Sequence, residues 1–304
     1  MGRGGDRSDR VAPQPEPMTG RTEVLAWFAP RRRAYPWRGA RDPYRVLVSE
    51  VMLQQTQAAR VAPAYRSFVR RFPTIWALAR APRADVVREW GSLGYNRRAV
   101  ALSEAARIII RDHRGRVPAD PQVLAGLPGV GPYTAAAVAS LGHGRPVPAI
   151  DTNVRRVVAR ARIGRDEAAP AEVQAAAAAW LDRSDPGSWN QALMDLGREL
   201  CRPAPRCQAC PLSGSCRFRA SLATPGRARR RQGRFEGSFR QVRGGVVREL
   251  RGVRSMTLAT LAARLGRSTA EVWSAVARLF ADGLVHAGPG ALAGRPSGRV
   301  RLAP

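Results

Sequence analysis

Two carboxylates, Glu50 and Asp151, occupy sequence contexts that predict opposite protonation states. Glu50 interrupts the apolar run VLVSEVML, where burial would raise its pKa toward the range of a general acid. Asp151 precedes TNVRRVVARA, and a helix start would keep its carboxylate ionised. Cleavage of a glycosidic bond requires such a pair, one to protonate the leaving group and one to stabilise an oxocarbenium-like sugar. Taken singly, Glu50 also fits a solvated helix face and Asp151 a helix cap.

The four cysteines form a second candidate site. Cys201, Cys207, Cys210 and Cys216 all lie in CRPAPRCQACPLSGSC, with the spacing C-x5-C-x2-C-x5-C. In a cytoplasmic protein so close a cluster favours a metal centre over disulfides. Zinc held by four thiolates usually draws on two CxxC pairs, whereas one CxxC flanked by two single cysteines suits an iron-sulfur cluster better. Zinc remains the alternative.

A glycine hairpin lies between the two carboxylates in the sequence. In LAGLPGVGPYTAAAV a helix is expected to end at Leu127, and Pro128 blocks its continuation. Gly129 and Gly131 then allow a tight hairpin before a new helix begins at Pro132. Outward-pointing amides and the positive helix terminus could grip a DNA phosphate without reading sequence. An ordinary helix-helix turn is the alternative.

The elements that must position these residues are helical. Asp42-Pro43 and Asp120-Pro121 each combine a capping side chain with proline at the first helical position. The first pair opens DPYRVLVSEVMLQQTQAARV, where apolar residues recur at helical spacing through Val61. Further helices fit TEVLAWFA, RADVVREW, NRRAVALSEAARIIIRDH, PAEVQAAAAAWL and SWNQALMDLGREL. No convincing strand precedes residue 220, so the fold is predicted to be mainly α.

The C-terminal region has a different pattern. After a basic linker at 219–236, TLATLAARLG and STAEVWSAVARLFADGL predict two helices joined by a tight turn, and the last segment predicts a short hairpin. This order indicates a winged-helix-like module at 237–304. We expect a disordered tail at 1–20 and a helical domain at 21–218, with the cysteine run at 201–216.

Composition narrows the class of partner. Lysine and arginine total 51 against 23 acidic residues, for a net charge of +28 and a pI of about 11.7. This charge favours a polyanion such as nucleic acid, although codon bias could also enrich arginine. No apolar run reaches the roughly 18 residues of a membrane span, and the first residues lack the apolar core of a signal peptide. We expect a cytoplasmic, nucleoid-associated monomer without membrane contact.

The hairpin, the downstream aspartate and the cysteine run together resemble the iron-sulfur helix-hairpin-helix DNA glycosylases, which include endonuclease III and the MutY-type adenine glycosylases. DPYRVLVSEVMLQQTQ resembles the MutY signature, and MDLGRELC matches the run into the cluster. The resemblance covers roughly Arg21 to Arg217. Endonuclease III relatives carry a nucleophilic lysine after GVGP, whereas this chain has Tyr133, which cannot form a Schiff base.

The resemblance implies a fold, a function and a set of site residues. The fold would be a helix-hairpin-helix glycosylase fold with an iron-sulfur cluster loop. The function would be monofunctional removal of adenine mispaired with 8-oxoguanine or guanine in double-stranded DNA, in base excision repair. Glu50 would protonate adenine and Asp151 would stabilise the sugar cation, with Tyr133 and Asn153 as supporting partners. Residues implied at the DNA are Gln54, Gln55 and Tyr95, of which the last two would enter the base stack, Trp37 and Arg38 near the flipped base, and Gly129 and Gly131 in the hairpin. The four cysteines would hold a 4Fe-4S cluster.

The sequence departs from the family pattern in several places. SLGYN stands for GLGYY, DTNV for DGNV, and the cysteine run begins C-x5-C rather than C-x6-C. The family usually has a MutT-like C-terminal domain, and we expect the winged-helix-like module in its place here. Two alternatives stay open: a thymine or uracil mismatch glycosylase of the same superfamily, and an iron-sulfur DNA-binding regulator. The QQT run and Glu50 favour the adenine glycosylase over both.

Overall fold

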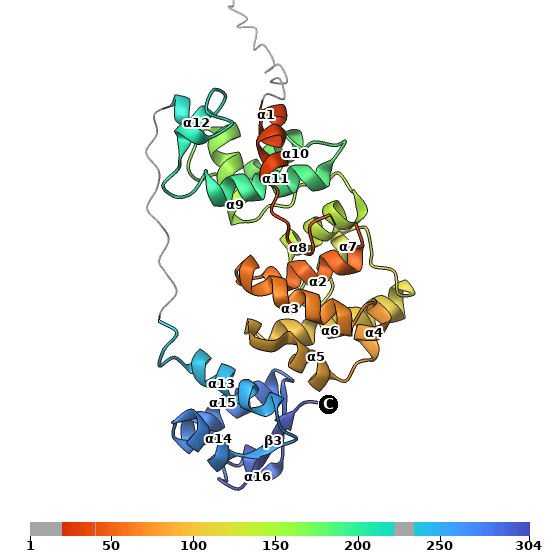
Figure 1. Cartoon of the computed structure of the whole chain (residues 1–304), viewed down its shortest axis with the longest axis vertical. Coiled ribbons are helices and arrows are strands. Elements are labelled where there is room, and N and C mark those ends of the chain that lie inside the picture. The colour runs from red at the N-terminus through yellow and green to blue at the C-terminus, as the bar shows by residue number, and fades with distance from the viewer. Residues whose placement is uncertain (1–19, 40, 222–233) are drawn as a thin grey trace, which may run out of the picture. The chain divides into compact units, whose positions relative to one another are not determined.

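The computed structural model describes residues 20–39, 41–221 and 234–304 (Figure 1). The tail expected at 1–20, apart from Gly20, and most of the linker expected at 219–236 lie outside the described residues. The chain divides into two compact units. One comprises residues 1–32, 151–182 and 191–226, and the other comprises residues 33–150, 183–190 and 227–304. Within the described ranges, no helix has both the length and the apolar composition that a membrane span needs.

Helices dominate both units, as the sequence predicts. The unit that contains Glu50 has α2 (Pro43–Leu53), α3 (Ala58–Arg71), α4 (Ile75–Arg80), α5 (Arg83–Trp90), α6 (Arg97–His113), α7 (Pro121–Ala125) and α8 (Pro132–Ala137), which runs into the π-helical turn Val138–Gly142. The unit that contains Asp151 has α1 (Arg21–Phe28), α9 (Thr152–Val158), α10 (Pro170–Ala179) and α12 (Arg217–Ala220). Helix α11 (Pro186–Glu199) begins in the unit that contains Glu50 and ends in the unit that contains Asp151.

Both Asp-Pro starts are confirmed as capped helices. The Asp42 side chain accepts a hydrogen bond from the Tyr44 amide at the start of α2, and Asp120 accepts one from the Gln122 amide at the start of α7. Helix α7 ends at Ala125, slightly before the end expected at Leu127. The hairpin therefore has six residues between α7 and α8, from 126 to 131.

The expectation of one helix through Val61 is wrong. Helix α2 ends at Leu53, and α3 begins only at Ala58. Gln55, in the turn between them, has a φ of 54°. The carbonyls of Val51 and Met52, which a continued helix would pair with the amides four residues later, also accept from the buried Arg98 guanidinium. Helical spacing of apolar residues does not reveal such a competing donor.

The core of the Glu50 unit surrounds α2. Leu47 and Met52 are fully buried, and Phe68 of α3 packs edge-on against Trp90 of α5, with ring centroids 5.9 Å apart. Burying a side chain of this size stabilises a fold by about 1.5–3 kcal/mol. Ile109 of α6 closes the same core. The residues around Glu50 are therefore held by close packing.

The C-terminal residues form the predicted winged-helix-like arrangement. Its elements are α13 (Phe239–Arg251), β1 (Met256–Thr257), α14 (Leu258–Leu265), α15 (Thr269–Ala281), β2 (Val285–Ala287), α16 (Pro289–Leu292) and β3 (Arg299–Leu302). The strands form an antiparallel sheet in the order β1-β3-β2. All strands among the described residues lie here, as expected. Helix α13 was not predicted, because its start adjoins the basic linker and it contains two glycines.

Candidate active site

Glu50 is buried and paired with Tyr133. The Glu50 side chain points inward from α2, and the residue is only 6% exposed. The Tyr133 hydroxyl, from α8, donates a hydrogen bond of 2.9 Å to Glu50 Oε2. The alternative of a solvated glutamate is therefore wrong. The structure brings together two of the predicted catalytic residues, which are 83 positions apart in sequence.

The hairpin is tied to the end of α2. Gln54 Nε2 donates to the Gly129 carbonyl over 3.0 Å and to Thr134 Oγ1 over 3.2 Å. Gly129 has a φ of 76°, and a Cβ there would lie 2.8 Å from the Ala101 Cβ. Gly131 has an ordinary φ of −85°, and nothing lies within 4 Å of where its Cβ would be. The fold thus requires glycine at position 129, whereas position 131 has open space beside the backbone.

Asp151 caps α9 and is also held by the side chain of Asn153. Its Oδ1 accepts from the backbone amides of Asn153 (2.9 Å) and Val154 (2.7 Å), and its Oδ2 accepts from Asn153 Nδ2 (2.9 Å). Burial raises the pKa of Asp151 above its ordinary value, although these three hydrogen bonds lower it. The expectation of a low pKa at the helix start is therefore wrong, because loss of hydration outweighs the donors. Cap and candidate catalytic carboxylate are the same group.

Arg156 connects this carboxylate to the cysteine run. Its Nη2 donates to Asn153 Oδ1 over 2.9 Å and to the Gly197 carbonyl over 2.8 Å, and its Nε donates to the Cys201 carbonyl over 2.6 Å. Gly197 allows the approach, since a Cβ there would lie 2.7 Å from the Asn153 Cβ. Sequence reasoning missed Arg156 and Gly197. Arg156 had a usable signal, because it follows Asn153 at i+3, the spacing of neighbours on one helix face.

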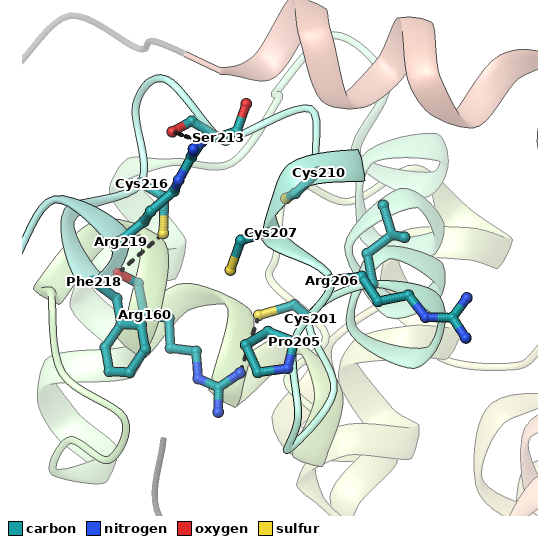
Figure 2. Close-up of a pocket in the computed structure, with 11 residues that line it drawn as sticks. Arg160, Cys201, Pro205, Arg206, Cys207, Cys210, Ser213, Cys216, Phe218 and Arg219 are labelled. Carbon is teal, nitrogen blue, oxygen red and sulfur yellow. Dashed lines mark hydrogen bonds between the residues drawn. The ribbon is translucent and has the colours of Figure 1, made fainter. Parts of the chain in front are cut away.

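The four cysteines line one pocket. Figure 2 shows the side chains of Cys201, Cys207, Cys210 and Cys216 around a common space. Burial, followed by the charges of the other three sulfurs, raises the pKa of the Cys210 thiol to about 11. Among the residues that the structure describes, no group of three or more His, Cys, Asp and Glu side chains is arranged to hold a metal ion. The thiols share a pocket without forming a set for one ion.

Arg160 is built into the wall of that pocket. It is 2% exposed, and its guanidinium donates to Cys201 Sγ over 3.8 Å and to the Arg202 carbonyl over 2.6 Å. The backbone carbonyl of Arg160 accepts from Cys216 Sγ over 3.8 Å. Its guanidinium also lies 5.1 Å from the centre of the Phe218 ring (Figure 2). A buried cation beside the Cys201 sulfur favours the thiolate form of that cysteine.

The other predicted DNA residues divide into buried and exposed ones. Trp37 is 8% exposed and stacks on Tyr35 with ring centroids 5.0 Å apart, so most of it belongs to the core. The Arg38 guanidinium lies 5.7 Å from the centre of the Tyr35 ring. Gln55 is exposed, and Tyr95 is 45% exposed with a φ of 48°. Gln55 and Tyr95 thus have the accessibility that contact with DNA requires.

Comparisons with known proteins agree with these features. The family described as the HhH-GPD superfamily of base excision DNA repair proteins matches residues 48–183. The adenine DNA glycosylase of Mycobacterium tuberculosis (strain ATCC 25618 / H37Rv) is 44% identical over 272 residues, covering 87% of this chain and 89% of that protein. The adenine DNA glycosylase of Mycolicibacterium smegmatis is 42% identical over 271 residues, covering 87% and 92%.

Solved structures show the same fold. A thermostable thymine-DNA glycosylase superposes with a TM-score of 0.62 at 31% identity, covering 66% of this chain and 94% of that chain. The mycobacterial matches cover more of the chain than residues 21–218 can supply, so that similarity extends into the C-terminal module. The chain therefore belongs to the HhH-GPD superfamily of base excision DNA repair proteins and, within it, to the family of the adenine DNA glycosylases.

Proposed function

We propose that this protein removes adenine from double-stranded DNA where adenine is mispaired with 8-oxoguanine or guanine. The observation that carries the proposal is the hydrogen bond between Tyr133 and the buried Glu50. It places a carboxyl group in a water-poor setting, beside a hydroxyl that fixes its orientation, as general acid catalysis requires. The similarity to relatives named adenine DNA glycosylases supports adenine as the base. A mispaired base costs least to flip out of the duplex, which favours mismatched substrates.

The two carboxylates take different parts in the proposed reaction. Glu50 gives its proton to the departing adenine as the bond between the base and C1′ of the sugar breaks. The bonding electrons leave with the base, so the sugar becomes an oxocarbenium-like cation that the negative charge of Asp151 stabilises. Water then adds its oxygen to C1′ and loses a proton. The products are free adenine and an abasic site.

Tyr133 determines what happens to the strand. A phenol cannot form the imine through which a lysine would cut the backbone at the abasic site. In this structure the Tyr133 hydroxyl is a hydrogen-bond donor to Glu50, so its role is to orient the acid. The strand is therefore expected to remain intact until alkali or heat is applied.

We also propose that the four cysteines hold a 4Fe-4S cluster. All four thiols line one pocket, as a group held jointly by four thiolates requires, and one CxxC flanked by two single cysteines favours an iron-sulfur cluster over zinc. Arg160 lies against Cys201 and supplies positive charge beside the thiolates. Hydrolysis of a glycosidic bond transfers no electrons, so the cluster would stabilise the loop and contribute no reaction step.

Single-turnover cleavage tests the proposed function. Four end-labelled duplexes are used, each with one mispair: A opposite 8-oxoguanine, A opposite guanine, T opposite guanine or U opposite guanine. Each reaction is quenched either with or without alkali. The proposal expects release from the two adenine duplexes, strand breaks only after alkali, and little or no protein trapped on DNA by borohydride. Efficient trapping would identify a different nucleophile, such as the amino terminus. The superposition with a thymine-DNA glycosylase makes thymine the second candidate for the base that is removed. Base release confined to the T and U duplexes would show that thymine or uracil, and not adenine, is the substrate base.

A further inference from the structure

Two exposed residues have a backbone conformation that residues other than glycine rarely adopt. Gln55 has a φ of 54° and Tyr95 a φ of 48°. A third such residue in the described part of the chain, Arg114, caps the end of α6. The left-handed region is unfavourable for residues with a Cβ and persists only where the surroundings hold it. Gln55 and Tyr95 are the two residues proposed to enter the DNA base stack, so the groups that hold them have a functional consequence.

One side chain contacts both turns. Arg98 lies near the start of α6, and its guanidinium is buried. On the side of the Gln55 turn, Nη1 donates to the carbonyls of Val51 (3.0 Å), Met52 (2.9 Å) and Gln54, and Nη2 donates to Thr56 Oγ1 (3.1 Å). Two of these partners, Gln54 and Thr56, lie directly before and after Gln55 in sequence. The guanidinium thus fixes the backbone on both sides of the exposed glutamine.

The same guanidinium fixes the turn that carries Tyr95. Nη2 donates to the Gly94 carbonyl over 3.1 Å, and Nε donates to the Tyr95 carbonyl over 3.4 Å. The guanidinium lies 5.4 Å from the centre of the Tyr95 ring and 5.3 Å from that of Trp90, within the range of cation-π contacts. Burial lowers the pKa of Arg98 to about 10, so the side chain remains protonated at neutral pH. Arginine has five N–H donors in one plane, more than any other side chain, so these acceptors are reached with an N–H shared between carbonyls.

We propose that Arg98 is a positioning residue that holds Gln55 and Tyr95 ready to enter the DNA base stack beside the flipped base. The inference rests on the proposed function and on the family resemblance, which implies that these two residues enter the DNA. Arg98 itself is buried and acts through them. Holding both turns before binding avoids the loss of conformational entropy that ordering them on the DNA would cost. Loss of Arg98 should therefore impair base flipping more than it impairs the fold.

Arg107 provides a matched control on the same helix. It also uses its guanidinium to hold carbonyls, donating to Ala79 over 3.2 Å and to Ala81 over 3.5 Å, but it contacts neither Gln55 nor Tyr95 in these bonds. Arg107→Met thus removes the same charge and two carbonyl bonds from α6, although Arg107 also pairs with Glu104 and is less buried than Arg98. A merely structural role for Arg98 would make the two variants behave alike.

The experiment measures base flipping and base release together. Full-length wild type, Arg98→Met, Arg98→Lys and Arg107→Met are compared on an A opposite 8-oxoguanine duplex with 2-aminopurine beside the target adenine. Thermal unfolding is followed by circular dichroism. For Arg98→Met we expect the fluorescence rise to be lost and the single-turnover rate at saturating enzyme to fall at least about tenfold. Arg98→Lys should be intermediate, and Arg107→Met should retain the rate within about threefold at a comparable loss of thermal stability.

A double-mutant cycle separates action through the two turns from an independent effect. If Arg98 acts through Gln55 and Tyr95, adding Arg98→Met to the double variant Gln55→Ala/Tyr95→Ala should slow release by less than about threefold. The inference would be overturned if Arg98→Met slowed release by the same factor in the double variant as in wild type. It would also be overturned if folded Arg98→Met flipped and released the base as wild type does. Should that variant fail to fold, Arg98→Lys decides by the same criteria.

Failure of the proposed function looks different, since wild type itself would then release no adenine. In that case the same fluorescence and rate comparison is made on the duplex that wild type does cleave.

Discussion

Asn153 donates to Asp151 twice, from its backbone amide to Oδ1 and from its side-chain Nδ2 to Oδ2, each over 2.9 Å. The direction of the side-chain amide is determined by Arg156, which donates to the other end of it, Oδ1. Asn153 must therefore present its NH2 group to the carboxylate. The arrangement favours the charged form of Asp151, whereas burial favours the neutral form. The reactivity of this carboxylate should depend on the balance between its hydrogen bonds and its burial.

Neutralising either carboxylate should abolish base release while preserving DNA binding. In Asp151→Asn the new Oδ1 can still cap α9, because asparagine caps helices as well as aspartate does. Its NH2 group would face Asn153 Nδ2 in place of an acceptor, which should lower stability by about 1 kcal/mol. Loss of the charge should slow release at least about a thousandfold, or about 4 kcal/mol of barrier. Glu50→Gln, which cannot give up a proton, should lose a similar factor.

Binding is titrated beside cleavage on the same adenine duplex to separate the two effects. Both variants should bind the mismatch nearly as tightly as wild type. If either released adenine within about tenfold of the wild-type rate, its residue would be a structural one, a helix cap for Asp151 or a buried core polar group for Glu50.

The pH dependence of release should reveal the raised pKa of Asp151. Catalysis needs the carboxylate form, which is lost as the pH falls through the folded-state pKa. Because burial raises that pKa, the acid limb of the single-turnover profile should lie above the value of about 4 typical of exposed aspartates. Asn153→Ala removes a donor to the charged form and should move the limb to still higher pH.

Rates are measured from acid to neutral pH in both proteins, and circular dichroism at each pH confirms that they are folded. Circular dichroism matters because protonation could also unfold the chain. An acid limb in Asn153→Ala at or below the wild-type position would show that Asn153 does not stabilise the charged form of Asp151.

Local sequence signals predicted much of this structure. Both Asp-Pro helix starts and most of the long helices were found, with α13 and the separation of α2 from α3 as exceptions, since capping and periodicity are encoded within a few residues. The apolar neighbours of Glu50 left both burial and a solvated face open, and the structure shows burial. The break after Leu53 was not predicted, because its cause, the Arg98 guanidinium, comes from a helix more than forty positions away. Long-range donors of this kind leave no periodic signal.

The candidate site shows the same limit. The cysteine spacing predicted a shared pocket, and the helix start predicted the cap made by Asp151. The direction of its pKa shift was wrong, because it depends on how much of the surrounding chain covers the carboxylate. Arg156 and Gly197 were missed, since their importance lies in the approach of α11 to the start of α9. Such approaches become visible only in three dimensions.

The pocket of four cysteines should contain iron. Protein purified without oxygen should be brown and hold about four irons per chain. Cys207→Ser should lower the iron content and the solubility or DNA affinity, whereas the intrinsic rate of the fraction that binds DNA should change least. Ser213→Ala is the control, because Ser213 lines the same pocket but carries no thiol. Stoichiometric zinc without iron would refute the cluster.

The two hairpin glycines should respond differently to alanine. At position 129 the new Cβ would meet the Ala101 Cβ, and the backbone would be held at a φ of 76°. Strain and overpacking together should destabilise the fold by about 1–3 kcal/mol. At position 131 the space is open and φ is ordinary, so Gly131→Ala should cost less than about 1 kcal/mol, mainly as a poorer start for α8.

DNA binding should show the reverse order once stability is taken into account. A phosphate that approaches the hairpin backbone needs the open space beside Gly131, and a methyl group there would hold the phosphate away from the amides. Gly131→Ala should therefore weaken binding of any duplex, matched or mismatched, because the hairpin contacts the backbone and reads no base. Affinities for both kinds of duplex are titrated at two salt concentrations, below the unfolding temperature of each variant. Wild-type affinity in Gly131→Ala would make the hairpin an ordinary helix-helix turn, and a loss confined to the mismatched duplex would assign it to base recognition.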